Sequence, residues 1–358
     1  MSKKRYKIRV DRIIAVLILI SSPIFLLIVL SKHSKEEKPN SSSSEVQTET
    51  SAVCTSSTKT ATTTPITTEP VTIPIINAPL CSASAFYSVD DNSYIYKDNI
   101  MKRVAPASLT KLLTASVALH YVDKDRIFTV DSEQWLVQPN SSLCYLQIGN
   151  TLTLEDLITG MLMASGNDAA YTIAVAVARE QNPNTYMTDD EAVNYFCILM
   201  NDFSHNLGMK NSNFVNPDGW DNEEQYTTVE DLIKLSEYAL SISEISNIIG
   251  TYQKSVTINS GETFSWTNSN LLLDPYSNYY CDFAVGMKTG TTPNAGNNLI
   301  AVFEKNKRMY ISIVTGCQSD ADRYELTLKL LSLAKWRGKI YETKKNCINT
   351  FGNCPNIR

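Results

Sequence analysis

Strand-like and helical segments follow a fixed order along the chain from residue 81 onward. Two short strand-like runs come first, and the turn signal Asp90-Asp91-Asn92 between them predicts a β-hairpin. A block of helical segments follows, at residues 108–122, 151–180, 189–208 and 227–240, and the stretch 151–180 reads as two helices joined near Ala164, Ser165 and Gly166. Four further strand-like runs and a last helix come after it, at residues 252–258, 263–266, 297–303, 309–316 and 322–336. Because strands at both ends flank the helices, we expect an α+β fold with one antiparallel sheet covered by helices.

The N-terminal part of the chain carries an apolar stretch without a charged side chain at residues 13–30, which is just long enough to cross a membrane. The segment before it, residues 1–12, has six basic residues and one acidic residue, and such a segment remains in the cytoplasm. We therefore expect a cytoplasmic tail, a single transmembrane anchor and the rest of the chain outside the cell membrane. A cleaved signal peptide is the alternative, although its apolar stretch is usually shorter and followed by small residues.

Residues 31–80 are rich in Ser, Thr and Pro and lack apolar periodicity, so we expect a disordered linker there. The composition becomes globular from residue 81, and we expect one catalytic domain at 81–340 with a short tail at 341–358. The net charge is −5 although the N-terminal tail is basic, so the catalytic region is acidic. An acidic surface argues against a nucleic-acid partner.

Eight cysteines and three histidines form no metal-binding pattern, since no Cys-x-x-Cys occurs. We therefore expect no metal and no cofactor. An extracellular location would permit disulfides, and Cys347 with Cys354 is the first pair to test. Cys197 lies in a helical run, where we expect it to act as a small buried apolar residue.

The pattern Ser-x-x-Lys can hold a nucleophile and its base. It occurs at Ser56 with Lys59, at Ser108 with Lys111 and at Ser332 with Lys335. The first pair lies in the linker and the last near the end of the final helix. Only Ser108 and Lys111 lie at the head of an apolar-periodic helix, where residues three apart share a face.

Serine needs an adjacent base to act as a nucleophile. Histidine supports this role poorly here, because His33 lies in the linker and His120 and His205 lie within helices. Lysine can act as the base if it is neutral, and burial and a second cation would both lower its pKa. Ser108 with Lys111 therefore requires another cation nearby and backbone N–H donors for an oxyanion.

Two further stretches meet these demands. Ser165, Gly166 and Asn167 offer a hydroxyl and an amide at a helix start. Lys288 supplies the second cation in the stretch "VGMKTGTTPNAGN", where Thr289 and Thr291 offer hydroxyl donors. Gly290 between them removes a side chain where an extended substrate could lie against a strand edge.

These motifs, S-L-T-K, S-G-N and K-T-G, together with "PASLTK", "SGNDAA", "FVNPDGWD" and "KTGTTPNAGN", resemble those of the low-molecular-mass penicillin-binding proteins, the serine D-alanyl-D-alanine carboxypeptidases. The resemblance covers roughly residues 82–337. It implies a five-stranded antiparallel sheet packed with helices. It also implies that the N-terminal helix, and not the C-terminal module of many relatives, anchors this chain.

The resemblance implies catalytic roles for three side chains. Ser108 would be the acylated nucleophile, Lys111 would take its proton, and Ser165 would relay a proton to the leaving D-alanine. The backbone N–H groups of Ser108 and Thr291 would form the oxyanion hole.

The resemblance also implies five substrate-binding residues. Asn167 would hydrogen-bond the peptide chain of the substrate. Lys288 would direct positive potential toward the terminal carboxylate, which Thr289 or Thr291 would contact, and Gly290 would leave room for the extended chain. The implied substrate is the D-Ala-D-Ala end of a peptidoglycan stem peptide, with β-lactams as inhibitors. Asp218 and Trp220 depart from the residues usual in the family, and we expect them to be structural without a chemical role.

Two alternatives differ in their chemistry. A class A-like β-lactamase would need a glutamate base for deacylation, in an E-x-x-L-N motif that is absent here; the nearest candidate, Glu230, lies in a predicted helix. A non-catalytic domain that binds the cell wall or β-lactams would not need Ser108, Lys111 and Lys288 to be intact.

Overall fold

The computed structural model describes residues 76 and 81–334. These residues belong to the second of two units into which the chain divides, residues 1–70 and 71–358. The predictions for the N-terminal tail, the apolar stretch 13–30, nearly all of the linker and the C-terminal tail with Cys347 and Cys354 lie outside the described residues. Among the described helices, none combines the length and the apolar character that a membrane crossing requires.

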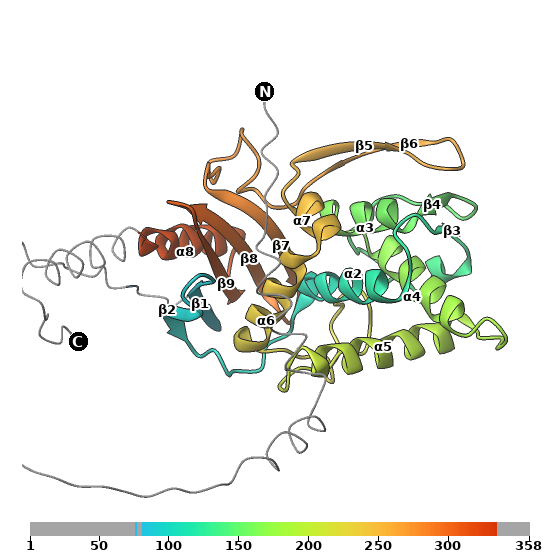
Figure 1. Ribbon diagram of the computed structural model, residues 1–358, viewed down its shortest axis with the longest axis horizontal. Coiled ribbons are helices and arrows are strands. Elements are labelled where there is room, and N and C mark those ends of the chain that lie inside the picture. The colour runs from blue at the N-terminus through green and yellow to red at the C-terminus, as the bar shows by residue number, and fades with distance from the viewer. Residues whose placement is uncertain (1–75, 77–80, 335–358) are drawn as a thin grey trace, which may run out of the picture. The chain divides into compact units, whose positions relative to one another are not determined.

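A five-stranded antiparallel sheet forms the centre of the described unit, in the order β2-β1-β9-β8-β7 (Figure 1). Its strands are β1 (Ala83–Ser88), β2 (Ser93–Asp98), β7 (Ala284–Thr292), β8 (Gly296–Lys305) and β9 (Arg308–Cys317). The hairpin expected at the start of the domain is β1 with β2, turning at Asp90, Asp91 and Asn92. The α+β prediction with a single main antiparallel sheet is therefore confirmed.

The central strands are buried on both faces because successive side chains alternate between two cores. On β8, Ile300 and Val302 belong to the larger core, which the main block of helices completes. Leu299 and Phe303 belong to a second core, which is completed by Tyr324 of the last helix, α8 (Asp320–Ser332). Helices thus cover both faces of the sheet, and α8 lies on the face opposite the helical block (Figure 1).

The helical block consists of α2 (Thr110–Tyr121), α3 (Leu154–Met163), α4 (Asn167–Gln181), α5 (Asp189–Asn206), α6 (Val229–Ser241) and α7 (Ser243–Ile249). The break predicted between two helices near Ser165 is confirmed between α3 and α4. The apolar periodicity of α2 predicts that one face of this helix is buried. In the structure every residue of 110–118 is buried, so the burial extends around the whole helix. A helix buried on all sides lies within the core, not on its surface, and the nucleophile helix is therefore held rigidly.

Several elements were not predicted. Strand β7 was missed because Gly286 and Gly290 interrupt its apolar pattern. The sequence also did not predict the short helix α7 or the strand pair β3 (Ile127–Thr129) and β4 (Thr151–Thr153). Two predicted strands, β5 (Gln253–Thr257) and β6 (Thr263–Thr267), form a separate hairpin outside the main sheet. The last helix begins at Asp320, directly after its Ser319 cap and two residues before the predicted start. Trp336, the predicted end, lies outside the described residues.

Candidate active site

Ser108 lies in a short 3-10 turn, η2 (Ala107–Leu109), directly before α2. Ala107 has a φ of 49°, a left-handed conformation that is rare for a residue with a Cβ and that marks local strain. The backbones of two glycines, Gly219 and Gly290, lie close to this turn. A Cβ on Gly219 would lie 1.8 Å from the Ala107 carbonyl oxygen, and one on Gly290 would lie 3.0 Å from the Ser108 backbone nitrogen. The turn is therefore enclosed by backbone on both sides.

Lys111 is fully buried beneath the nucleophile. Its Nζ donates hydrogen bonds to the Ser108 Oγ at 2.8 Å, to the Asn167 Oδ1 at 2.7 Å and to the Asp218 backbone oxygen at 2.7 Å. Burial lowers the pKa of Lys111 to about 8, and the carboxylates of Asp218 and Asp168 partly oppose this shift. With this pKa about a tenth of the lysine is neutral at pH 7 and about half at pH 8, and the neutral form can accept the proton of Ser108.

Lys288 lies on β7 and is 1% exposed. Burial is the main reason that its pKa falls well below the usual lysine value, and the positive charges of Lys111 and Arg323 add to the effect. The Nζ donates to the Thr289 carbonyl oxygen at 3.1 Å. The charge of Lys111 therefore reaches Lys288, whereas the low pKa of Lys111 itself is caused by burial and not by the second cation.

Asn167 is the first residue of α4. Its side chain connects Lys111 to Asp218, for which the sequence predicted no chemical role. Its Nδ2 donates to the Asp218 Oδ2 at 2.6 Å, while its Oδ1 accepts from Lys111. Asp218 is 1% exposed, and burial raises the pKa of its carboxyl group. The expectation that Asp218 is only structural is therefore corrected, because both its backbone and its side chain take part in the lysine network.

Ser165 lies between α3 and α4 with a φ of 61° and is nearly buried. The described contacts join Lys111 to Ser108, Asn167 and Asp218, and not to Ser165.

Asp168, the second residue of α4, was missed as a site residue. Its carboxylate accepts the backbone N–H groups of Cys144 and Leu146, each at 3.0 Å, and so fixes the loop beside α4.

The edge strand β7 presents the predicted K-T-G residues, because no further strand of the described sheet pairs with its outer side. The Thr289 hydroxyl pairs with that of Ser269 at 2.7 Å. Arg323, at the start of α8, was also missed. Its guanidinium donates to the Thr291 Oγ1 at 3.0 Å and to the Gly290 carbonyl oxygen at 3.4 Å, which adds a third cation at this edge.

The two helical histidines take no part in the site. His120 and His205 are exposed, and His120 packs edge-on against Phe203. Among residues 81–334, therefore, neither histidine forms a Ser-His-Asp arrangement with Ser108. Within residues 81–334 no cluster of three side chains could hold a metal ion. The expected small buried role of Cys197 is confirmed, since it is 6% exposed in the core.

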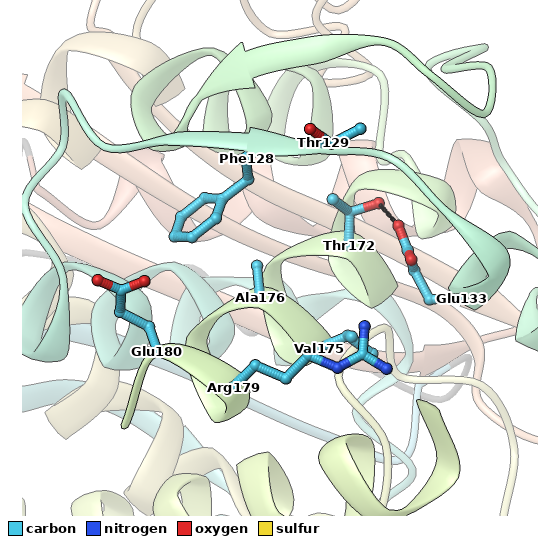
Figure 2. Close-up of a pocket in the computed structure, with 8 residues that line it drawn as sticks. All are labelled: Phe128, Thr129, Glu133, Thr172, Val175, Ala176, Arg179 and Glu180. Carbon is cyan, nitrogen blue, oxygen red and sulfur yellow. Dashed lines mark hydrogen bonds between the residues drawn. The ribbon is translucent and has the colours of Figure 1, made fainter. Parts of the chain in front are cut away.

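A cavity of about 260 Å³ lies at the far part of α4, between that helix, β3 and η3 (Ser132–Leu136) (Figure 2). Glu133 accepts a hydrogen bond from the Thr172 hydroxyl at 2.7 Å, and Arg179, whose guanidinium also lines the cavity, pairs with Asp189 at 2.7 Å. None of the residues predicted for the active site lines this cavity, so it is separate from Ser108.

Three features of the described residues are typical of the penicillin-recognising serine enzyme superfamily: a strained serine turn, a buried lysine in contact with it, and a second buried lysine on the edge of a five-stranded antiparallel sheet. The chain belongs to the D-alanyl-D-alanine carboxypeptidase family, peptidase S11, whose family model matches residues 75–319. The resemblance read from the three motifs is thereby confirmed.

Similar proteins share the fold and part of the sequence. The chain is 27% identical over 248 residues to the D-alanyl-D-alanine carboxypeptidase DacF of Bacillus subtilis, with 68% of this chain and 59% of that protein covered. It is 32% identical over 276 residues to DacC of Escherichia coli, with 72% and 63% covered. The solved structure of the Streptomyces K15 DD-transpeptidase is similar with a TM-score of 0.65 at 26% identity, and 74% of this chain and 98% of that chain are covered. The chain thus spans about three fifths of the length of the first two relatives.

Proposed function

We propose that this chain is a serine-type D-alanyl-D-alanine carboxypeptidase that removes the terminal D-alanine from peptidoglycan stem peptides through an acyl-serine intermediate. One observation carries the proposal: the fully buried Nζ of Lys111 lies 2.8 Å from the Oγ of Ser108, with its pKa lowered to about 8. Curated relatives named D-alanyl-D-alanine carboxypeptidases support the same reaction.

In the acylation step, the Ser108 Oγ attacks the carbonyl carbon of the penultimate D-alanine while neutral Lys111 accepts the hydroxyl proton. The negative charge that develops on the carbonyl oxygen is stabilised by the backbone N–H groups of Ser108 and Thr291. The C–N bond then breaks, and the leaving D-alanine amine takes a proton that Ser165 relays from Lys111. For this relay a substrate must bring Ser165 into the hydrogen-bond network that Lys111 makes with Ser108.

In substrate binding, the peptide adds as an extended strand to the open edge of β7. Gly290 suits this geometry because its lack of a side chain leaves the nucleophile accessible. The terminal carboxylate is attracted by Lys288 and contacts the hydroxyl of Thr289 or Thr291, and Asn167 hydrogen-bonds the peptide backbone. Arg323 holds the Thr291 hydroxyl and strengthens the positive potential.

In the deacylation step, a water molecule attacks the acyl-serine ester while neutral Lys111 takes its proton, which releases the shortened peptide and restores Ser108. A β-lactam acylates the same serine by opening its ring. Its leaving nitrogen stays attached to the acyl group and hinders the approach of water, so the drug remains bound.

Labelling with a fluorescent penicillin, followed by peptide mapping, tests the proposal. We expect stable label on the peptide that contains Ser108, together with release of D-alanine from a D-Ala-D-Ala-terminated pentapeptide. Absence of label would favour the non-catalytic binding domain, and rapid hydrolysis of the drug would favour the class A-like β-lactamase. An added amino acceptor in the same assay tests for transpeptidation, the activity named for the Streptomyces K15 protein.

We also propose that residues 13–30 anchor the protein in the cell membrane, with residues 1–12 in the cytoplasm and the catalytic domain outside. The apolar length and the basic segment before it support this arrangement. Protease added to intact cells should digest the linker at residues 31–80 and release the catalytic domain. Its resistance in intact cells, together with digestion after lysis, would place the domain inside and contradict the arrangement.

A further inference from the structure

Two cysteines lie at the adjoining ends of β1 and β9. Cys81 comes two residues before β1, and Cys317 is the last residue of β9. The final registered pair of the two strands is Ala83 with Thr315, and the Ser82 N–H donates to the Thr315 carbonyl at 2.7 Å. This bond is one residue out of the register of the ladder, so the regular pairing ends here, next to Gly316 with its positive φ. Cys81 and Cys317 directly adjoin Ser82 and Gly316 at these two strand ends, and a disulfide requires that their side chains also approach each other.

The two thiols are in contact. A hydrogen bond between them is the largest influence on both: it lowers the pKa of Cys81 and raises that of Cys317. The backbones also approach closely here, because Gly316 has a φ of 69° and a Cβ on it would lie 2.3 Å from the Ser82 Oγ. We propose that Cys81 and Cys317 form a disulfide that clamps the start of β1 to the end of β9.

The proposed disulfide lies next to Asn298, whose side chain holds the segment that leads into Ser108. The Gly316 N–H donates to the Oδ1 of Asn298 at 2.8 Å. The Nδ2 of Asn298 donates to the carbonyl oxygens of Ala105 and Pro106, at 3.0 and 3.2 Å, in the segment that leads into Ser108. A disulfide at Cys317 would therefore fix the strand end on which this segment rests.

The bond forms by exchange with a disulfide-class oxidant, such as glutathione disulfide or a thiol–disulfide oxidoreductase. Cys81 is half-buried and has the lower pKa, whereas Cys317 is 1% exposed, so Cys81 attacks first. Its thiolate forms a mixed disulfide with one sulfur of the oxidant and releases the other as a thiol. Cys317 then attacks the Cys81 sulfur and displaces the second thiol. Two protein thiols are oxidised, and one disulfide of the oxidant is reduced to two thiols.

Mass spectrometry of the full chain tests the pairing. The protein is equilibrated with glutathione and glutathione disulfide, trapped with N-ethylmaleimide in denaturant, and digested without reductant. We expect a linked peptide pair containing Cys81 and Cys317, two hydrogens lighter than the two separate thiol peptides. Recovery of both cysteines as N-ethylmaleimide adducts, or of either one linked to a different cysteine, would overturn the proposal.

Thermal unfolding tests the clamp and separates this disulfide from any other. Reduction of the full chain should lower Tm by on the order of 10 °C, because the bond closes a long loop of the chain. The Cys81→Ser variant should lose this dependence on reductant, whereas Cys281→Ser, which changes another half-buried cysteine, should retain it. A wild-type Tm that does not respond to reductant, or an equal response in Cys81→Ser, would contradict the clamp. Neither result depends on peptidase activity, so this proposal can fail while the proposed function stands.

Discussion

The carboxylate of Asp218 accepts a hydrogen bond of 2.6 Å from the side-chain amide of Asn167. This bond joins the loop before α6 to the start of α4 and fixes which end of the amide faces Lys111. Because the Nδ2 group is held by the carboxylate, the Oδ1 atom is left to accept from the lysine at 2.7 Å. The Pro217 carbonyl of the same loop accepts the Thr114 hydroxyl of α2 at 2.6 Å, so the loop is also attached to the nucleophile helix.

The contact of Lys111 with Ser108 predicts that Lys111→Ala slows acylation by a fluorescent penicillin by about 10²–10⁴-fold, because the nucleophile loses its base. The rate is measured by stopped-flow or by gel fluorescence after timed quenching. Lys254→Ala is the matched control, since Lys254 is a partly buried lysine whose Nζ contacts the Thr159 hydroxyl at 3.4 Å. Wild-type labelling rates in Lys111→Ala, with an unchanged Tm, would mean that another group accepts the proton.

The lowered pKa of Lys111 predicts how acylation depends on pH. The base acts when it is neutral, and its neutral fraction grows with pH, so the rate should rise through a midpoint near pH 8 and level off above it. The Asp218 carboxylate is the main charge that raises this pKa against the effect of burial. Asp218→Asn should therefore move the midpoint to lower pH, because the protonated lysine loses a favourable partner.

Second-order acylation rates between pH 5 and 10 measure this shift. Asp202→Asn, at an exposed position of α5, is the control and should leave the midpoint unchanged. A midpoint that moves to higher pH in Asp218→Asn, or that stays fixed, would show that Asp218 does not set the charge of the lysine.

The close approach of Gly219 to the nucleophile turn predicts that Gly219→Ala abolishes labelling and lowers Tm. Its Cβ would lie 1.8 Å from the Ala107 carbonyl oxygen, a backbone atom that cannot move aside without displacing Ser108. Gly261→Ala separates this clash from backbone strain, because Gly261 also has a positive φ but a Cβ there meets nothing within 4 Å. The control should lose only ~1–2 kcal/mol from its left-handed backbone and label fully. Equal effects in both variants would contradict the clash.

The hydrogen bonds of Asp168 predict that Asp168→Ala is strongly destabilising. The buried N–H groups of Cys144 and Leu146 would lose their acceptor, at roughly 1.5–3 kcal/mol for each bond to a charged group. We expect a fall in Tm of on the order of 10 °C by differential scanning calorimetry. Asp202→Ala removes an exposed carboxylate and should change Tm by a degree or two. A Tm loss no larger than this control would mean that the loop finds other acceptors.

The sequence predicted the features that depend on local order and spacing. The helix boundary beside Ser165 was visible because Ser and Gly interrupt an apolar run. Ser108 and Lys111 could be paired because the sequence predicted that both lie at the head of one helix, where residues three apart share a face. In the structure Ser108 lies in the turn η2, directly before α2, and the pair is still in contact. The order of strands and helices likewise limited the fold to one antiparallel sheet with helical layers.

The sequence did not reveal Asp218 as a partner of Lys111, because this contact joins distant positions. The Asp218 carbonyl lies 107 residues from Lys111, and such a separation leaves no periodic signal. Asn167, 56 residues from Lys111, was named through its S-G-N motif, but its bond to the lysine came only from the structure. Strand β7 was hidden by its glycines, and its position at the sheet edge follows only from the pairing of β8 with β9. Local spacing and the helical context therefore singled out Ser108 and Lys111 as the candidate nucleophile and base. Tertiary packing decided the burial and the neighbouring charges that set the pKa of Lys111.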